Sequence, residues 1–230
     1  TKKDGSFITN IGSELIFSNS LIIATGGLSI PKMGATKFGY DIAKKFDIKV
    51  VETLPALVPL TFSDKLLLKC KELTGLSLDS IISLNKNSFK EGMIFTHRGL
   101  SGPSILQISS YWKLGNDIKI NLSPNFDIYQ FLINKKETNP KQDITTLIAE
   151  VIPKRLSISI CRDQRIGGNI SELSNKLLQK LSNSINNWSV SPTGSEGYRT
   201  AEVTLGGVDT NELSSKTMMS KKHNGLYFVG

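Results

Sequence analysis

Glycine-bearing turns are the features of this sequence whose residue types and spacing could hold a ligand. Three of them follow apolar or extended runs, namely "ATGG" at 24–27, "TLGGV" at 204–208 and "FVG" at 228–230. Glycine has no Cβ, so a nucleotide pyrophosphate or a flat ring can pack directly against the main chain. In open α/β sheets such ligands gather at the carboxyl ends of strands. For each turn taken alone, simple chain reversal is the alternative, and no GxGxxG occurs in the sequence.

A polar loop, "FTHRGLSGPS" at 95–104, could bind an anion or a carbonyl oxygen. It contains Thr96, His97, Arg98 and Ser101. The loop precedes an expected helix, whose first turn offers free N–H groups and the positive end of the helix dipole. The alternative is that these polar side chains cap the helix and contact water. No G-x-S-x-G elbow is present. His97 and Arg98 are therefore the candidates for contacting a substrate anion or moving a proton, and no further catalytic residue is assigned.

Cysteine and histidine usage excludes several other kinds of site. The sequence has two cysteines, Cys70 and Cys161, and two histidines among 230 residues. These numbers predict no disulfide framework and no metal site, and they favour a reducing cytoplasm. No apolar run is long enough to span a membrane, and the first residues lack the apolar core of a signal peptide. We therefore expect a cytoplasmic protein without a membrane partner.

The charge balance is basic, but its pattern does not indicate a known nucleic-acid-binding motif. The net charge is +8 at pH 7, which in general favours anionic partners. The lysines are scattered along the sequence and are not interleaved with aromatic residues, and no RRM, KH or zinc-finger spacing occurs. Nucleic acid is accordingly the less favoured partner, and solvated surface lysine is the preferred interpretation. The oligomeric state stays unassigned.

The elements that must position these turns indicate α/β structure at both ends of the chain. The first part is expected to form two strands around a turn at 10–13. A third, apolar strand at 20–24 should be buried on both faces. Ile42, Ala43 and Phe46 have the spacing of a helix, after which an extended run is expected at 50–51. The chain is expected to be extended again at 198–208 and to end in an apolar strand at 225–230.

The middle of the chain has a different pattern. Pro55 and Pro59 exclude a regular helix or a central strand there. Short extended segments are expected at 76–84, 88–96 and 117–122. One helix, beginning at the "GP" of 102–103, interrupts them.

Residues 126–187 are expected to be helical. The clearest helix has apolar side chains every four residues, at Leu173, Leu177, Leu181 and Ile185. Asn169 and Glu172 resemble a capping box, which would begin that helix at 169. The fold class is thus mixed, with both α/β and α+β character.

Four ordered motifs resemble one bacterial flavoprotein family. They are "ATGGLSIPKMGATKFGYDIAKKF", "PALVPL", "GMIFTHRGLSGPSILQIS" and "AEVTLGGVDTNELSSKTMMSKKHNGLYFVG". The family is known as the NAD(FAD)-utilising dehydrogenases, or aminoacetone-oxidase-family FAD-binding enzymes. The resemblance implies a glutathione-reductase-type FAD-binding domain that is interrupted by an insert of a small β-barrel and a helical subdomain.

On this resemblance, residues 1–54 and 201–230 are parts of the FAD-binding domain and 55–200 form the insert. Within the insert, 55–125 and 188–200 would form the barrel and 126–187 the helical subdomain. The residues that the resemblance places beside FAD are Ala24, Thr25, Gly26, Gly27, Thr204, Gly206, Gly207, Val208 and Gly230.

The resemblance also implies a function. The expected activity is that of a FAD-dependent oxidoreductase, which transfers a hydride between flavin and a small organic substrate and uses NAD(P)H as a possible electron partner. The family's first βαβ fingerprint and last glycine-rich segment are not in this sequence. We therefore expect an internal fragment that is inactive alone. The alternative function is a non-enzymatic basic module that contacts anionic partners.

Overall fold

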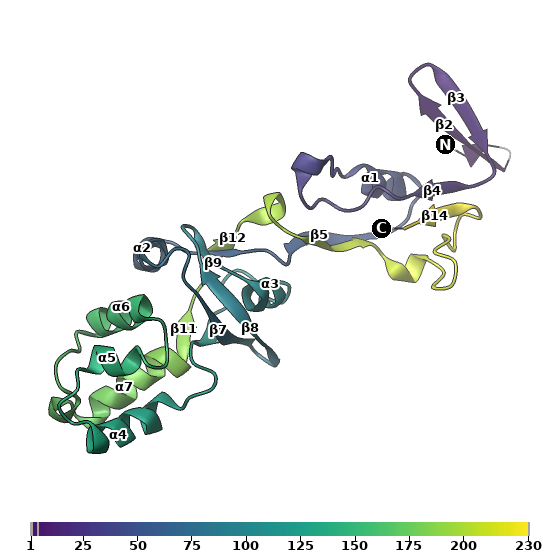
Figure 1. Ribbon diagram of the computed structural model, residues 1–230. Coiled ribbons are helices and arrows are strands. Elements are labelled where there is room, and N and C mark those ends of the chain that lie inside the picture. The colour runs from purple at the N-terminus through teal and green to yellow at the C-terminus, as the bar shows by residue number, and fades with distance from the viewer. Residues whose placement is uncertain (1, 4, 230) are drawn as a thin grey trace. The chain divides into compact units, whose positions relative to one another are not determined.

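Two units make up the chain, whose residues 2–3 and 5–229 are described by a computed structural model (Figure 1). Unit 1 takes both ends of the chain, up to Ala56 and from Gly197 onward, and unit 2 takes Leu57–Glu196. The fold is mixed α+β. The sequence pattern had placed the two borders after residues 54 and 200.

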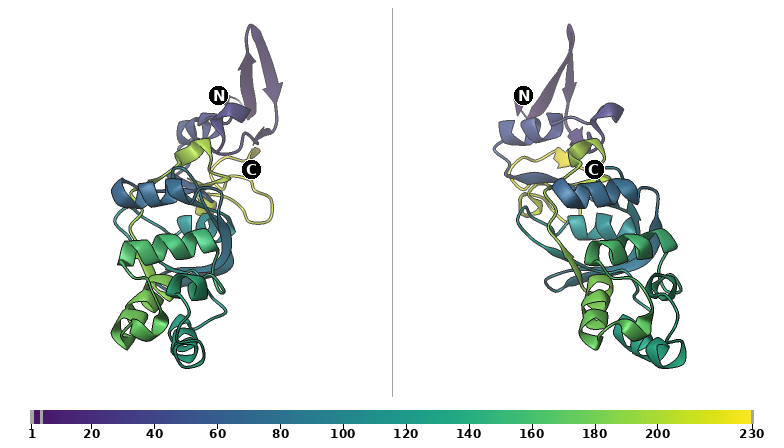
Figure 2. Two further views of the ribbon diagram at one scale, coloured as in Figure 1. Left: turned by 60° about the vertical axis from the view of Figure 1, so that its left-hand side comes forward. Right: turned by 90° about the vertical axis from the view of Figure 1, so that its left-hand side faces the viewer.

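Unit 1 consists of short strands in three small sheets, one α-helix and short 3₁₀ turns. In chain order its elements are β1 (Lys2–Lys3), β2 (Ser6–Ile11), β3 (Glu14–Ser18), β4 (Leu21–Ile23), η1 (Pro31–Met33), α1 (Phe38–Lys45), β5 (Val50–Ala56), η3 (Gly197–Arg199), β13 (Val203–Val208), η4 (Thr210–Glu212) and β14 (Leu226–Phe228). Both views of Figure 2 show β2 and β3 as an extended two-stranded ribbon. The predicted hairpin and helix at this end are confirmed.

The fourth strand and the last strand of the chain pair with each other. β4 and β14 are parallel, with Ile22 opposite Tyr227, so segments about 200 residues apart form one ladder. The prediction that the first of these strands is buried on both faces is wrong. Ile23 is buried, but 61% of the Ile22 side chain is exposed, because no described element covers that face of this two-stranded ladder.

A second ladder of unit 1 joins β5 to β13. Pro55 lies opposite Thr204 in it, and a proline is tolerated here because the ladder has two strands and each has a free edge. The register shifts between Leu205 and Gly207. At Gly206, whose φ is +82°, a Cβ would lie 2.1 Å from the Glu52 carbonyl oxygen. Only glycine therefore fits this bulge.

A seven-stranded sheet forms the centre of unit 2, in the order β11-β10-β7-β8-β9-β6-β12. Its strands are β6 (Leu60–Thr61), β7 (Ser77–Leu84), β8 (Asn87–Phe95), β9 (Gly99–Ser101), β10 (Ile118–Asn121), β11 (Trp188–Val190) and β12 (Gly194–Ser195). Every pairing is antiparallel. Among the described residues no ladder joins β11 to β12, so the sheet is open and the expected closed β-barrel is not found.

Helices supply the rest of unit 2. They are α2 (Asp64–Glu72), α3 (Pro103–Ser109), α4 (Ile128–Thr138), α5 (Ile144–Ile148), α6 (Lys154–Gln164), η2 (Ile170–Glu172) and α7 (Asn175–Asn186). Figure 1 shows α4, α5, α6 and α7 gathered in one group. Helix α2 was missed by the sequence analysis, which expected only extended structure between Pro59 and Pro103 apart from short turns.

The start of α7 differs from its prediction. Asn169 and Glu172 enclose the separate turn η2, and Leu173 is extended, with φ −89° and ψ 133°. The hydroxyl of Ser174 then accepts from the Leu177 amide at 3.3 Å and begins α7. Of the four predicted apolar positions, Leu181 and Ile185 are buried in α7, whereas Leu177 is exposed and Leu173 precedes the helix. The predicted capping residue was wrong as well.

Candidate functional site

A cavity of about 450 Å³ in unit 1 is the best candidate for a ligand site. Its size falls in the range of small-molecule and cofactor pockets. Its walls come from the ends of β4 and β14, from α1, from the bulge of β13 and from the segment after it. The lining residues are Ile23, Thr25, Gly26, Gly39, Tyr40, Gly206, Gly207, Val208, Thr210, Leu213, Met218, Phe228 and Val229.

The glycines around this cavity have two different roles. Gly26 has φ +67°, and a Cβ built on it would meet no atom within 4 Å, so its bare backbone faces open space. Gly27 and Gly39 permit close packing instead. A Cβ on Gly27 would lie 2.5 Å from the Thr204 hydroxyl oxygen, and one on Gly39 would lie 2.6 Å from that of Thr25. Gly26 is therefore the glycine of the "ATGG" turn that leaves room for a ligand.

Thr204 holds the "ATGG" turn in place. Its hydroxyl oxygen accepts hydrogen bonds from the amides of Leu28 at 2.9 Å and Ser29 at 3.2 Å. It also shares a hydrogen bond of 3.0 Å with the Ser29 hydroxyl. Thr204 does not line the cavity. Its contribution is to fix the turn against β13, so that Gly26 and Gly207 lie on the same cavity.

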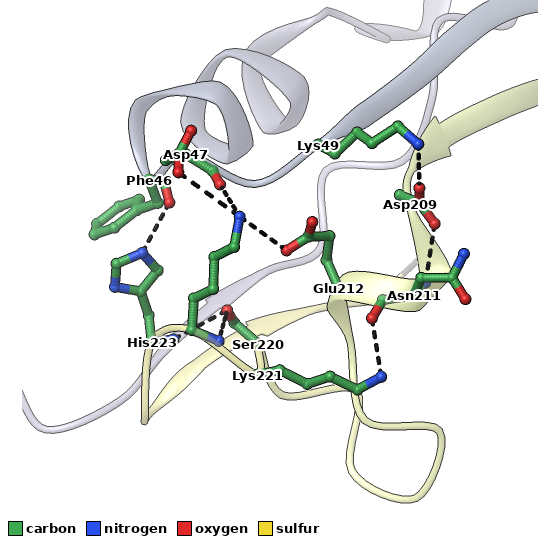
Figure 3. A network of polar contacts seen from close by, with 10 residues as sticks. Phe46, Asp47, Lys49, Asp209, Asn211, Glu212, Ser220, Lys221 and His223 are labelled. Atoms are coloured by element: carbon green, nitrogen blue, oxygen red, sulfur yellow. Dashed lines mark hydrogen bonds and ion pairs between the residues drawn. The ribbon is translucent and has the colours of Figure 1, made fainter.

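A network of polar contacts holds the segment 209–223, which forms one wall of the cavity (Figure 3). The Lys222 ammonium donates to the Asp47 carbonyl oxygen at 2.8 Å and pairs with Glu212 at 3.1 Å. The His223 imidazole contacts the Phe46 carbonyl oxygen at 2.8 Å. These contacts join the end of α1 to the loop that contributes Met218, and they raise the pKa of Lys222, chiefly through the bond to Glu212.

Asp209 stabilises the beginning of the same wall. Its carboxylate accepts from the Asn211 amide at 2.9 Å and pairs with Lys49 at 3.0 Å (Figure 3). These two bonds, the one from the Asn211 backbone first, hold the pKa of Asp209 below its usual value. The charged carboxylate caps the turn η4, directly after Val208 on the cavity wall.

Tyr40 is a cavity residue that the sequence analysis missed. Its ring lies beside two glycines, since a Cβ on Gly207 would be 3.3 Å from the ring and one on Gly27 would be 3.1 Å from the hydroxyl. Burial, with a smaller contribution from Tyr198, raises the pKa of the Tyr40 phenol. The neutral phenol is a hydrogen-bond donor at the cavity wall. No motif signals this role, because the residue lies inside an ordinary amphipathic helix.

The residues predicted beside a cofactor are placed as follows. Those on the cavity wall are Thr25, Gly26, Gly206, Gly207 and Val208. Ala24 is exposed and does not line the cavity. Gly27 and Thr204 do not line the cavity, and their close contact holds the turn in place. Gly230 lies outside the described residues. The apolar residues Leu213 and Met218 were missed, because they come from a segment that meets the turns only in the folded chain.

His97 and Arg98 lie in unit 2, in the tight turn between β8 and β9. Both are exposed. The Thr96 hydroxyl oxygen accepts from the amides of Arg98 at 3.2 Å and Gly99 at 3.1 Å, which closes the turn. A Cβ on Gly99 would lie 2.1 Å from the Leu60 carbonyl oxygen. The glycine is thus explained by strand packing, and the geometry assigns neither polar side chain a chemical role.

The expected anion site at the start of α3 is not supported by the structure. Gly102, which precedes the helix, packs so closely on β8 that a Cβ would lie 2.9 Å from the Gly92 carbonyl oxygen. The buried Ser104 hydroxyl donates to that same carbonyl at 3.1 Å. The first turn of the helix is therefore turned toward the sheet. In the described part of the chain, no group of three His, Cys, Asp or Glu side chains could hold a metal ion. No helix there is long and apolar enough to cross a membrane.

Both cysteine thiols are enclosed by the core of unit 2. Burial raises the pKa of Cys70 to about 12, and it also raises the pKa of Cys161. The arginines near Cys161 in the sequence do not offset this effect. Both thiols stay protonated at neutral pH.

Comparison with known proteins finds relatives that match along the whole chain. The ribosomal RNA dihydrouridine synthase of Escherichia coli is 45% identical over 100% of the chain and 58% of the relative. The protein of the same name from Haemophilus influenzae is 42% identical over 97% of the chain and 56% of the relative. The 3-dehydro-bile acid delta(4,6)-reductase of Clostridium scindens is 23% identical over 97% of the chain. The chain spans less than three fifths of the length of these relatives.

These names correct two expectations. A small-molecule substrate was expected and nucleic acid was thought an unlikely partner, but the two most identical of these relatives are named for action on ribosomal RNA. Lysines that are scattered in sequence do not exclude a nucleic-acid partner. A folded surface can gather residues that are far apart in the chain. The names also differ from that of the aminoacetone-oxidase-type enzymes.

A family model gives the assignment of the chain. The model described as the HI0933-like protein barrel and H2TH domain matches residues 54–203. That match contains all of unit 2 and the adjoining ends of unit 1. It covers well over half of the 230 residues, and the chain therefore belongs to the HI0933-like protein family.

Proposed function

We propose that this chain is the substrate-binding and part of the cofactor-binding portion of a flavin-dependent oxidoreductase that forms dihydrouridine in RNA. The observation that carries the proposal is the 45% identity to a ribosomal RNA dihydrouridine synthase over the entire chain. The relatives are named as enzymes, so the alternative of a non-enzymatic binding module gains no support from them.

The cavity of unit 1 supports the flavin part of the proposal. A shared fold does not by itself carry a function, so the site has to fit the cofactor. The cavity has apolar walls at Ile23, Leu213 and Phe228 and bare backbone at Gly26 and Gly207. No lysine or arginine is among its lining residues. Such a site suits the flat, uncharged ring system of a flavin rather than the pyrophosphate of FAD.

The chemistry of the proposed reaction is the saturation of one carbon–carbon double bond. Conversion of uridine to dihydrouridine adds two electrons and two protons across C5 and C6 of the base. A bound reduced flavin would supply the hydride, and NADH or NADPH is the proposed source of the electrons. The protein has to bind both partners, exclude water and provide hydrogen-bond donors.

The residues of this chain can meet these needs at the cavity. The backbone at Gly26 offers N–H and C=O groups to open space, because a Cβ there would meet no atom within 4 Å. The apolar side chains Leu213, Met218 and Phe228 exclude water from the wall. The neutral Tyr40 phenol can donate a hydrogen bond at the same wall. Thr204 and Lys222 keep the walls in position through the bonds described above.

The test uses the complete protein that contains this chain. It is purified and its absorbance is measured near ~450 nm, where an oxidised flavin absorbs. It is then incubated with ribosomal RNA that lacks dihydrouridine and with NADH or NADPH, and the RNA nucleosides are analysed by mass spectrometry. We expect a flavin band and a nucleoside heavier than uridine by two hydrogens.

Different results would contradict the cofactor assignment and the proposed reaction. A protein without a flavin band, even after reconstitution with FAD or FMN, would refute the cofactor assignment. A protein that holds flavin but leaves every uridine of the RNA unchanged would refute the reaction. Free uridine serves as the substrate control and should not be reduced at a comparable rate.

A further inference from the structure

We propose that unit 2 carries a docking surface for single-stranded RNA, formed by amide and lysine side chains around a hollow between the 121–127 loop and α7. We call it the amide surface. It consists of Lys90, Lys119, Asn121, Asn125, Phe126, Lys176, Gln179, Lys180, Asn183 and Asn187. The proposal rests on the proposed function only for the choice of RNA as the partner, and its position in the molecule rests on the structure.

The hollow has a volume of about 540 Å³, and amides dominate its lining. Its residues are Asn121, Pro124, Asn125, Phe126, Asp127, Tyr129, Gln179, Ser182, Asn183, Asn186 and Asn187. One carboxylate, Asp127, is among them. Its oxygen accepts from the Gln130 amide at 3.1 Å and caps α4. The carboxylate thus has a structural partner, and the remaining polar lining is uncharged.

Asn186 builds the hollow and is not available to a ligand. Its amide nitrogen donates to the Asn121 side chain at 3.0 Å and to the carbonyls of Ser123 at 3.2 Å and Phe126 at 3.0 Å. Its amide oxygen accepts from the Ile128 backbone at 2.9 Å. One side chain therefore fixes the whole loop against α7, so the hollow is preformed.

Exposed amides surround this anchor. Asn125, Asn183 and Asn187 are exposed. The oxygen of Asn125 accepts from Lys90 at 3.3 Å, and that of Asn183 accepts from Gln179 at 3.3 Å. Within the described residues, the amide nitrogens of Asn125 and Asn183 donate to no protein group. These donors are free to meet the edge of a nucleobase.

The exposed face of α7 extends the surface along the helix. Lys176, Lys180, Asn183 and Asn187 follow one another at steps of four, three and four residues and are all exposed. Side chains at this spacing lie in one line on a helix. Neither lysine is in an ion pair within the described part of the chain. This line of side chains therefore carries two lysine ammonium groups followed by two asparagine amides.

The sheet extends the surface on the other side. Lys90, Ile81 and Asn121 lie opposite one another across β8, β7 and β10. Lys119 is two residues from Asn121 on the same strand, so its side chain points to the same face. Lys90 and Lys119 are exposed. The amide surface therefore carries lysines on both sides of the hollow.

The charge and chemistry of this surface match a nucleotide strand. Unit 2 has 17 Lys and Arg residues against 12 Asp and Glu residues, a net charge of +5 at pH 7. Lysines on both sides suit the phosphate backbone. The amides can hydrogen-bond the open edges of unpaired bases. The Phe126 ring, 48% exposed at the rim, offers a face on which a base can stack.

The test is RNA binding by the complete protein and by variants of the amide surface. A fluorescein-labelled, unstructured RNA of about 12 nucleotides is titrated by fluorescence anisotropy at salt concentrations between about 50 and 200 mM. The variants are Lys176→Gln with Lys180→Gln, Asn183→Ala with Asn187→Ala, and Phe126→Ala. The matched control is Lys65→Gln with Lys71→Gln, which removes two exposed lysines from α2 in the same unit.

The expected results differ between the variants. Loss of Lys176 and Lys180 should weaken binding by about tenfold and reduce the salt slope by about 1. Loss of the two asparagines, or of Phe126, should weaken binding by about fivefold to tenfold with an unchanged salt slope. The α2 control should bind within about twofold of the unaltered protein. Circular dichroism establishes that each variant is folded.

The contradicting results are distinguishable from failure of the proposed function. If the α2 control weakens binding as much as the α7 variant, general charge explains binding and the surface is refuted. If all variants bind normally while the protein still forms dihydrouridine, the surface is refuted and the proposed function stands. If the unaltered protein neither binds RNA nor forms dihydrouridine, both are refuted.

Discussion

Unit 1 and unit 2 differ in how they are held together. The buried apolar cluster of unit 2 contains 31 described residues, whereas that of unit 1 contains seven. Of the 19 exposed large hydrophobic residues in the described chain, 13 lie in unit 1. A large core makes a unit stable on its own. A large number of exposed apolar side chains indicates surfaces that contact other parts of a protein or another protein.

Because of this difference, the two units form their candidate sites from different parts of the chain. Unit 2 has a full core, so its outer side chains are free to form the amide surface. Unit 1 builds its cavity from main chain at Gly26 and Gly207, and it depends on a few polar contacts such as those of Thr204 and Lys222.

The largest effect is expected when the two units are separated. Residues 57–196, expressed alone, should fold and unfold cooperatively, because the large core lies entirely within them. Residues 1–56 joined by a flexible linker to 197–230 should not. Thermal unfolding followed by circular dichroism measures both. Cooperative unfolding of the unit 1 polypeptide, or its absence in the unit 2 polypeptide, would contradict the contrast.

The second effect concerns the dry core of unit 2. Burial raises the pKa of Cys70 to about 12, while the thiol of an unfolded chain has its ordinary pKa of about 8.5. This difference in pKa makes its full contribution to the free energy of unfolding below about pH 8.5. The contribution is lost as the pH rises toward 12. At pH 10 the loss should be about 2 kcal/mol.

Urea unfolding at pH 7.5 and pH 10 measures this loss. Cys161, whose pKa is also raised, acts in the same direction, so the control is the Cys70→Ala variant, which should lose less stability between the two pH values. Rapid reaction of either thiol with a water-soluble disulfide reagent in the folded protein at pH 8 would show that the core is not closed.

The third effect is expected at the turn of unit 1. Thr204→Val removes the acceptor of two backbone amides, those of Leu28 and Ser29, while keeping the side-chain shape. We expect unit 1 to lose about 1–3 kcal/mol, because the amides are left without a partner. Hydrogen exchange should show faster exchange in 24–29 and in β13. Unchanged exchange there would mean that Thr204 does not hold the turn.

The smallest effect on stability is expected for alanine substitutions at two glycines with positive φ. Comparing them separates the cost of backbone strain from an effect on ligand binding. Gly26 and Gly12 have similar φ values, +67° and +63°, and a Cβ on either would meet no atom within 4 Å. Gly26→Ala and Gly12→Ala should therefore each cost about 1 kcal/mol. Only Gly26→Ala should lower the flavin content of the complete protein, since Gly26 lines the cavity and Gly12 does not. Equal flavin content in both variants would contradict the cavity assignment.

The sequence was informative where local chemistry determines structure. The extended segments predicted at 76–84 and 88–96 are the strands β7 and β8, and two of the four predicted apolar helix positions, Leu181 and Ile185, are buried in α7. The start of α7 was misplaced because Asn169 and Glu172 bond to each other without starting the helix, at 3.2 Å. The open form of the sheet could not be predicted, because it depends on long-range pairing of β6 with β9 and β12.

The candidate sites likewise contain some residues that the sequence signals and others that only the fold brings together. The glycine turns were visible because glycine itself is the signal. Tyr40 and Leu213 were not, since ordinary residue types reach the cavity only through folding. The lysines seemed scattered in sequence, yet Lys176 and Lys180 align on one helix face, and Lys90 reaches the same hollow through its bond to Asn125. The proposed RNA surface depends on this alignment.

The measurement that tests the account most directly is the kinetics of dihydrouridine formation by the complete protein as the RNA concentration is varied. The account assigns cofactor binding to unit 1 and RNA binding to unit 2. Lys176→Gln with Lys180→Gln should therefore raise KM for RNA about tenfold and leave kcat unchanged. Gly26→Ala should lower kcat in proportion to its flavin content and leave KM unchanged. If both variants change the same parameter, or if the lysine variant lowers kcat alone, this division of roles is wrong.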